Sequence, residues 1–318
     1  MMAKYIVAVS GGVDSVVLLY MLATGRIALP LVEETGAQRQ LQGEELLLEL
    51  TSKSSAEGQV PPVTFIVAHF DHGIRPESAD DAEFVKNLAE KYNLPFEMTR
   101  EELGANASEE LARNRRYEFL RKIAKKHDAK IVTAHHADDA IETIAINLTR
   151  GTGWRGLAVL DSTDIWRPLL VMTKAEIIAY AKKKELEWRD DVTNANTKYL
   201  RNNLRQKLMT IDDTTRQALI MYWKRQLFLK HEIDSEVRSC VGASSYSRYL
   251  FIMTSDQTAI ELLRGVIVNE VGVSPTRPQL VRALLAIKVF ATGNRYEIGN
   301  DVSLRFTRTH FIVELIDE

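Results

Sequence analysis

The chain has 318 residues, of which 45% are hydrophobic and 26% charged, and this composition is that of a globular protein with about two domains. The 41 Lys and Arg nearly balance 43 Asp and Glu, so the net charge of −2 does not indicate a nucleic-acid partner, and the only cysteine, Cys240, excludes an intramolecular disulfide and a cysteine-cluster metal site. Because no apolar run approaches the ~20 residues of a membrane span and the chain starts without a signal peptide, we expect a cytoplasmic protein with no membrane partner.

The first predicted element is a buried strand at 5–9, rich in β-branched residues, and an apolar run at 16–22 that favours a helix follows it. Between them stands Ser-Gly-Gly-Val-Asp-Ser, whose two glycines allow backbone conformations closed to other residues. The unpaired N–H groups of the helix N-terminus would face outward beside the positive end of the helix dipole, as in phosphate-binding sites. The expected phosphate-binding residues are Ser10, Gly11, Gly12, Val13, Asp14 and Ser15, with the Asp14 carboxylate also placed to hold Mg²⁺.

Two adjacent glycines alone would indicate an ordinary βα turn, but the full string at 10–15 is more specific. It lacks the lysine of the Walker loop and the third glycine of the dinucleotide fingerprint, so neither of those families fits. It resembles the pyrophosphate loop (PP-loop) of the N-type ATP pyrophosphatases, which split ATP into AMP and pyrophosphate while adenylating an acceptor. The resemblance implies ATP and Mg²⁺ as the cofactors.

Residues 24–62 differ from their surroundings. They hold turn residues, a short candidate helix at 43–50 and a polar tract at 52–59. A crossover between two strands normally needs only a few loop residues, so we interpret this stretch as an insertion. It is either a mobile flap or a surface elaboration without function.

The second predicted strand, at 63–71, carries polar residues where it ends. Ligands of an open parallel sheet lie beyond the carboxyl ends of its strands, and four polar side chains fall there within seven positions. A lone histidine would more often be structural. We therefore expect a ligand site here, with His69 on ATP and with Asp71, His72 and Arg75 on the substrate.

A long helix is predicted at 106–127, after a helix at 79–92 and a short strand at 96–100. Ser108 is its expected N-cap. Basic runs of this kind are usually solvated helix faces. Arg113 and Arg116, however, share a face with Tyr117 and Leu120, so we expect this face to look inward.

A further buried strand at 130–134 runs directly into a cluster of histidines and acids that opens a helix. The cluster contains His135, His136 and, three apart on one helical face, Asp139 and Glu142. Acids at a helix N-terminus also complement the helix dipole, but this does not explain the histidines. A zinc site is the alternative, yet the spacing matches no standard zinc motif, and carboxylates suit Mg²⁺ or a cationic substrate better.

The rest of the first half is rich in arginines, amides and glycines. A glycine-rich basic turn at 150–156 begins with Arg150 and could approach a phosphate backbone, an extended segment follows at 167–170, and an amphipathic helix is predicted at 174–186. The polar stretches at 188–194 and 198–205 suit phosphates and base edges as well as they suit capping and salt bridges. Their candidate substrate residues are Arg201, Asn202 and Arg205.

From about residue 211 the pattern changes. Helices are predicted at 215–230, at 258–271 and from 274 to 290, around a central stretch at 246–253, and the chain closes in a β-hairpin at 294–315. We therefore expect an α/β protein with two domains. Residues 1–210 form an open parallel sheet that carries the insertion, and residues 211–318 form a smaller α+β domain.

The motifs, taken together, resemble those of the tRNA(Ile)-lysidine synthetases. They stand in family order at His69–Arg75, Ala112–Tyr117, Ala134–Thr143, Arg150–Leu157, Arg167–Leu170, Trp188–Asn194 and Arg201–Arg205. The chain departs from the family pattern at Ala140 (Gln in the family), Trp154 (Leu) and Lys174 (Arg). Only the missing Gln side chain puts a polar contact in doubt.

The resemblance implies a fold like that of the adenine nucleotide α-hydrolases and a two-step reaction on the wobble cytidine of an isoleucine tRNA with a CAU anticodon. ATP adenylates the base, pyrophosphate leaves, and the amine of free L-lysine displaces AMP. Asp139 and Glu142 would recognise the lysine cation, and Arg113 and Arg116 would contact the nucleotide phosphate or the lysine carboxylate. A carboxylate, His135 or His136 would be the general base. The C-terminal domain would bind tRNA. Whether the protein forms a homodimer is left open by the sequence.

Two alternatives are another PP-loop enzyme that adenylates a tRNA base and a tRNA-binding paralogue without catalysis. Thiolating enzymes of the superfamily use cysteine persulfides or an iron–sulfur cluster, which one cysteine cannot supply. GMP and NAD synthetases share the Ser-Gly-Gly loop but lack the His-His-x-Asp-Asp set. The intact loop at 10–15 argues against a paralogue without catalysis.

Overall fold

The computed structural model describes residues 3–27, 64–73, 78–104, 107–189, 204, 207–208, 210–242 and 245–316. Most of the predicted insertion at 24–62 therefore lies outside the described residues, as do Arg75, Arg201, Asn202 and Arg205. The chain divides into two compact units, Met1–Arg225 and Gln226–Glu318, and the division falls within a single helix, α8 (Asp213–Cys240). Across the described ranges, no helix has the length and apolar character needed to cross a membrane.

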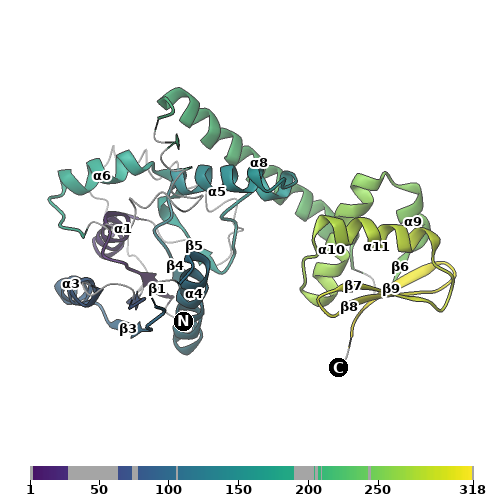
Figure 1. Ribbon diagram of the computed structural model, residues 1–318, viewed down its shortest axis with the longest axis horizontal. Coiled ribbons are helices and arrows are strands. Elements are labelled where there is room, and N and C mark those ends of the chain that lie inside the picture. The colour runs from purple at the N-terminus through teal and green to yellow at the C-terminus, as the bar shows by residue number, and fades with distance from the viewer. Residues whose placement is uncertain are drawn as a thin grey trace. The chain divides into compact units, whose positions relative to one another are not determined.

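The first unit is an α/β unit (Figure 1). Its described strands form a five-stranded parallel sheet in the order β3-β2-β1-β4-β5, which confirms the predicted fold class. The strands are β1 (Lys4–Ala8), β2 (Thr64–Asp71), β3 (Phe96–Arg100), β4 (Lys130–Val132) and β5 (Ile165–Trp166). The helices are α1 (Val13–Ala23), α3 (Ser78–Lys91), α4 (Glu109–His127), α5 (Ala137–Thr149), α6 (Lys174–Lys183) and the 3-10 turns η1 (Trp154–Leu157) and η2 (Pro168–Val171).

Both faces of this sheet are covered, because the central strand β1 is apolar on both sides. Successive strand residues point to opposite faces, so Tyr5 and Val7 pack with α1, α3 and α6 while Ile6 packs with α4. Ile6 and Val7 have no exposed surface. Complete burial of each such side chain stabilises the fold by roughly 1.5–3 kcal/mol, which holds the end of β1 in a fixed place.

The strand order brings two loops together at the carboxyl edge. The chain passes from β1 to β2 on one side and returns to β4 on the other side of β1. Such a reversal of strand order is where open parallel sheets bind ligands. The turns after β1 and β4 therefore define the expected site.

One predicted element of this unit is wrong. Residues 167–170 are not extended, because Pro168–Val171 forms the 3-10 turn η2. The proline explains the difference, since its fixed φ is already suited to the first position of a helical turn.

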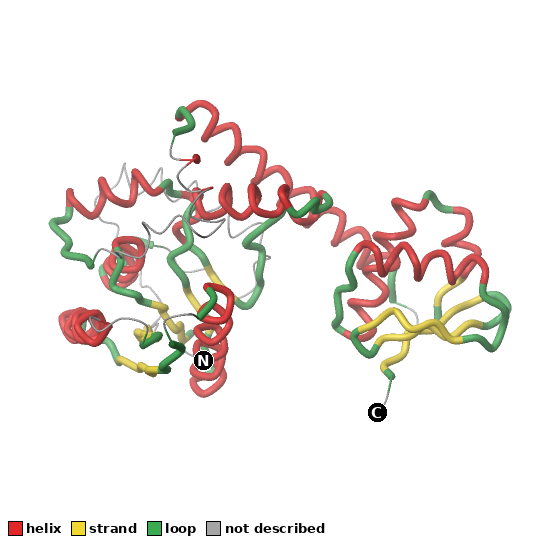
Figure 2. Tube along the Cα trace, viewed as in Figure 1, coloured by secondary structure: helices red, strands yellow, loops and turns green. Residues whose placement is uncertain are grey.

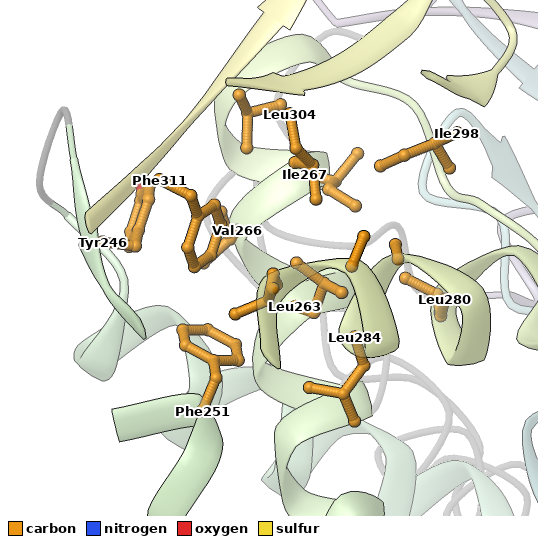
Figure 3. Packing of buried hydrophobic residues seen from close by; sticks show 14 of the residues in the cluster. Tyr246, Phe251, Leu263, Val266, Ile267, Leu280, Leu284, Ile298, Leu304 and Phe311 are labelled. Carbon is orange, nitrogen blue, oxygen red and sulfur yellow. The ribbon is translucent and has the colours of Figure 1, made fainter. Parts of the chain in front are cut away.

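The second unit is a small α+β unit, as predicted. Within its described residues, helices α9 (Arg248–Met253), α10 (Asp256–Val271) and α11 (Arg277–Val289) pack on an antiparallel sheet of order β6-β9-β8-β7 (Figure 2). The strands are β6 (Tyr246–Ser247), β7 (Arg295–Gly299), β8 (Val302–Phe306) and β9 (His310–Leu315). The antiparallel pairing predicted at 294–315 is present, but it joins three strands and not the two of a single hairpin. Its core joins Leu263 and Ile267 of α10 to Leu284 of α11 and to Leu304 and Phe311 of the sheet (Figure 3).

Candidate active site

The predicted phosphate loop joins β1 to α1. Gly11 has φ +92°, a left-handed value that favours glycine, and Gly12 is the N-cap of α1. The buried Ser15 hydroxyl donates to the Gly12 carbonyl at 2.9 Å and accepts from Ser10 N–H at 3.2 Å. Ser15 therefore shapes the loop from within, while Ser10 is exposed and the first-turn N–H groups of α1 lack an intrahelical partner. This is an anion-binding arrangement.

The Trp188–Asn194 motif begins beside this loop. Arg189 N–H donates to the Gly11 carbonyl at 2.9 Å, and the Arg189 guanidinium lies 5.5 Å from the centroid of the Phe84 ring. The remainder of the motif, from 190 onward, lies outside the described residues. Arg189 thus helps to fix the loop backbone.

Asp14 is the carboxylate of this loop and meets side chains from two other elements. Lys174 Nζ at the start of α6 lies 2.6 and 2.8 Å from its two oxygens, and His136 Nε2 lies 3.9 Å away. The Asp14 side chain is 28% exposed, so it is open to a ligand. Mg²⁺ typically takes one or two carboxylates together with phosphate oxygens, and Asp14 beside the loop fits that donor set.

His136 is buried among three carboxylates where β4 leads into α5. Its Nε2 lies 3.6 Å from Asp139 Oδ2, and its Nδ1 lies 3.8 Å from Asp138 Oδ2. Asp139 also caps α5, since its Oδ2 accepts from His136 N–H at 2.9 Å. With Asp14 on the other side, these carboxylates form an acidic cluster (the acidic pocket) beside the phosphate loop, and Lys174 and Arg216 offset part of its charge.

Glu142 extends this acidic face. It lies three residues after Asp139 on α5 and is only 4% exposed, so the predicted carboxylate pair sits on one helical face with its second member inside the protein. Among the described residues, no three His, Cys, Asp or Glu side chains are grouped as a protein-only metal site requires. A magnesium ion here would need oxygens from the nucleotide.

A basic cluster lies on the other side of the β4 turn, around His135. Arg113 and Arg116 of α4 flank the Tyr117 ring at 5.1 and 5.6 Å from its centroid, and the buried Arg167 donates to the Leu160 carbonyl at 3.0 Å. The pKa of His135 is lowered to about 3, mainly by burial and in part by the charges of Arg167, Arg113 and Arg116, against the opposing effect of Asp139. His135 is therefore neutral at physiological pH, with Nδ1 2.7 Å from Thr133 Oγ1.

The polar residues at the end of β2 contact other groups of the protein. His69 Nδ1 lies 2.9 Å from the Val9 carbonyl, so this nitrogen carries the proton and ties β2 to the base of the phosphate loop. Asp71 Oδ1 accepts from Gly73 N–H at 2.9 Å, and its Oδ2 lies 3.2 Å from Arg100 Nη1. His72 is half-buried and packs on Phe70. His69 thus supports the base of the phosphate loop, while Asp71 ties the end of β2 to Arg100 of β3.

Arg150 is not brought to this site by α5. It is the C-cap of the helix whose N-terminus bears His136 and Asp139. A helix of 13 residues spans about 20 Å, so Arg150 lies at the opposite end.

Sequence reasoning missed several residues of the site. They are Lys174 on Asp14, Asp138 beside His136, and Arg216 of α8, which donates to Asp138 Oδ1. One signal was available for Lys174. A cation in the first turn of a helix opposes the helix dipole, so its presence there indicates a specific anionic partner.

Known proteins resemble this chain in the region of the site. Residues 2–211 match the model of a PP-loop domain. A protein of Thermotoga maritima named tRNA(Ile)-lysidine synthase is 30% identical over 301 residues, which cover 89% of this chain and 65% of that protein. Proteins of the same name from Exiguobacterium sibiricum and Bacillus cereus are each 36% identical, over 52% and 64% of this chain and 44% and 39% of their own lengths. The chain thus spans less than two thirds of these relatives.

Proposed function

The chain belongs to the PP-loop family, and we propose that within it the chain ligates free L-lysine to the 2-position of the wobble cytidine in the CAU anticodon of isoleucine tRNA. In this reaction ATP is cleaved to AMP and pyrophosphate through an adenylated cytidine. The observation that carries the proposal is the meeting of the phosphate loop at Asp14 with the acidic pocket around His136. One part suits the leaving phosphates of ATP, and the other suits a cationic acceptor. The names of the similar proteins support the same reaction.

The ATP half of the reaction is assigned to the loop. Ser10 and the N–H groups at the start of α1 would hold the departing phosphates, where the helix dipole favours negative charge. Asp14 would hold Mg²⁺, which when bound stabilises the charge that develops on the leaving pyrophosphate. Lys174, already in contact with Asp14, adds a second cation at the same place.

The lysine half is assigned to the acidic pocket. Asp139 and Glu142 attract the substrate ammonium, and His136 lies within 3.6 Å of Asp139. The amine must lose a proton before it can attack, which from a pKa of ~10.4 costs roughly 4–5 kcal/mol at neutral pH. Because burial lowers the pKa of His135 to about 3, that residue is a poor proton acceptor, and His136 or a neighbouring carboxylate is the better base.

The tRNA and the remaining anionic groups are assigned to arginines. Arg113, Arg116 and Arg167 surround the neutral His135, and guanidinium groups bind phosphate or carboxylate bidentately. They would take the nucleotide α-phosphate or the lysine carboxylate. We assign tRNA binding to residues 211–318, and tRNA contacts in the first unit to Arg150, Arg201, Asn202 and Arg205.

One assay separates this function from its alternatives. Purified protein is incubated with ATP, free lysine and unmodified minor isoleucine tRNA, and pyrophosphate release is followed. Release should require both lysine and a tRNA with a CAU anticodon. Release that ignores lysine would instead indicate another PP-loop enzyme that adenylates a tRNA base. A protein that binds the tRNA without any release would be a paralogue that has lost catalysis.

A further inference from the structure

A continuous line of polar contacts reaches the phosphate loop from α8. Arg216 of α8 donates through Nη1 to Asp138 Oδ1 at the start of α5. Asp138 Oδ2 accepts from the main-chain N–H of Lys174 at 2.7 Å, and the Lys174 ammonium contacts both oxygens of Asp14. The line therefore runs from Arg216 through Asp138 and Lys174 to Asp14, over four helices.

The first link in this line is well anchored. The side chains of Arg216 and Asp138 are only 19% and 13% exposed, so removal of one charge would leave the other poorly solvated. The second arm of the guanidinium donates to the Leu208 carbonyl at 3.0 Å. Seven residues further along α8, the buried Trp223 indole donates to the Val159 carbonyl at 3.1 Å. Arg216 thus projects from a helix segment that is itself fixed to the first unit.

The second link does more than cap a helix. α6 already has a capping box, because Thr173 accepts from Glu176 N–H and the Glu176 carboxylate accepts from Thr173 N–H. Asp138 adds a bond to the next main-chain N–H, that of Lys174, and leaves the lysine side chain available. This bond fixes the position from which the ammonium reaches Asp14, at a helix end where a cation is otherwise disfavoured.

We propose that Arg216 is a positioning residue of the phosphate loop, which acts through Asp138 to hold Lys174 where its ammonium meets Asp14 and the phosphates of ATP. The inference rests on the proposed function only in that the loop binds ATP. Arg216 itself touches no reacting atom. Its loss should weaken ATP binding because the first turn of α6 and the lysine on it lose their fixed place.

The test measures the affinity of the whole chain for α,β-methylene-ATP with Mg²⁺, in the absence of tRNA, by titration calorimetry. Arg216→Met should weaken binding about 5- to 10-fold, and Lys174→Met about 10-fold. Arg216→Lys, which keeps a cation near Asp138, should recover part of the loss. The double variant should bind no more weakly than Lys174→Met alone, because a residue that acts through another is not additive with it. Gln217→Met, at the adjacent exposed position of α8, is the matched control and should bind like the parent.

Folding is checked by urea denaturation of each variant. Should Arg216→Met fail to fold, Asp138→Asn supplies the same test, since its amide oxygen still accepts from Lys174 N–H while the charge that Arg216 holds is gone. Parent-like affinity in Arg216→Met, or additive losses in the double variant, would overturn the positioning role and leave the proposed function standing. A parent protein that does not bind the analogue would overturn the proposed function and this inference with it.

Discussion

Two clusters of histidine and aspartate stand at the carboxyl ends of β2 and β4, the strands on either side of β1. They differ in the groups that their polar atoms contact. After β2, His69 is bonded to the Val9 carbonyl, and both Asp71 oxygens meet groups of the protein itself. After β4, His136 lies at 3.6–3.9 Å from the carboxylates of Asp14, Asp138 and Asp139. The first cluster is held by contacts to the backbone and to Arg100, whereas the second places several carboxylates around a buried imidazole.

This difference shows that position at a strand end does not by itself make a ligand site. A polar group whose hydrogen bonds are completed within the fold contributes to stability, and its loss exposes an unsatisfied partner. A cluster of like charges attracts cations, and in the β4 cluster Lys174 and Arg216 already pair with Asp14 and Asp138. The two clusters should therefore respond in opposite ways to loss of a carboxylate.

The largest effect is expected at the β4 cluster. Asp139→Ala should lower lysidine formation by about 10²- to 10³-fold, because the acidic pocket loses the charge nearest to His136. Asp139→Asn should lose nearly as much activity while it keeps the cap on His136 N–H and parent-like stability. Turnover is followed by pyrophosphate release and folding by circular dichroism. Near-normal turnover of either folded variant would show that the Asp139 carboxylate is not needed for the reaction.

The β2 cluster should show the reverse pattern. Asp71→Ala removes the partners of Gly73 N–H and Arg100 and should lower the free energy of unfolding by about 1–3 kcal/mol. Affinity for α,β-methylene-ATP should change less than about twofold, since neither carboxylate oxygen faces the loop. Urea denaturation and titration calorimetry measure the two quantities. A large loss of affinity for α,β-methylene-ATP without a loss of stability would show that Asp71 binds the ligand. The two clusters would then not differ in function.

The phosphate loop itself offers a matched pair of glycines. Gly11→Ala should cost about 1–2 kcal/mol of stability, because φ is +92° there and an added Cβ meets Phe84 and Val85 only at ordinary contact distances of 3.5 and 3.6 Å. Gly12→Ala, at φ −70°, should cost less than about 1 kcal/mol. Equal costs at both positions would show that crowding, and not backbone conformation, requires the glycines.

The last effect concerns pH and His135. Burial lowers its pKa to about 3 from an ordinary value of 6.5, so below 6.5 the unfolded chain takes up a proton that the folded protein excludes. Stability should therefore fall as the pH drops from 6.5 towards 3. Between pH 7 and pH 5 the parent should lose up to about 2 kcal/mol more than His135→Gln in urea denaturation. Parallel losses in the two proteins would contradict a neutral imidazole at position 135.

Much of the first unit follows from local patterns in the sequence. Apolar, β-branched runs such as Ile6–Val7 and Ile131–Val132 mark strands that are buried on both faces, and the polar residues after them mark the carboxyl edge. The contacts of Lys174 and Arg216 could not be predicted in the same way. They depend on how α6 and α8 pack against α5, and no local pattern records which distant carboxylate a cation will meet.

The second unit shows a similar limit at an element boundary. A helix was expected at 215–230, but α8 continues to Cys240. Nothing between Lys230 and Cys240 breaks a helix, and the first glycine after them is Gly242. For the end of this helix, the absence of glycine and proline is therefore a better guide than the point where the amphipathic pattern stops.

The central place of β1 in the sheet has a consequence for how the protein is made. Among the described strands β1 is synthesised before the others, and its two neighbours, β2 and β4, end only at Asp71 and Val132. Until both have been synthesised, the two hydrogen-bonding edges of β1 lack their native partners, and unpaired strand edges favour aggregation. The antiparallel sheet of the second unit needs only the contiguous stretch from Tyr246 to Leu315. During synthesis β1 therefore waits longer for its native partners than the strands of the second unit do.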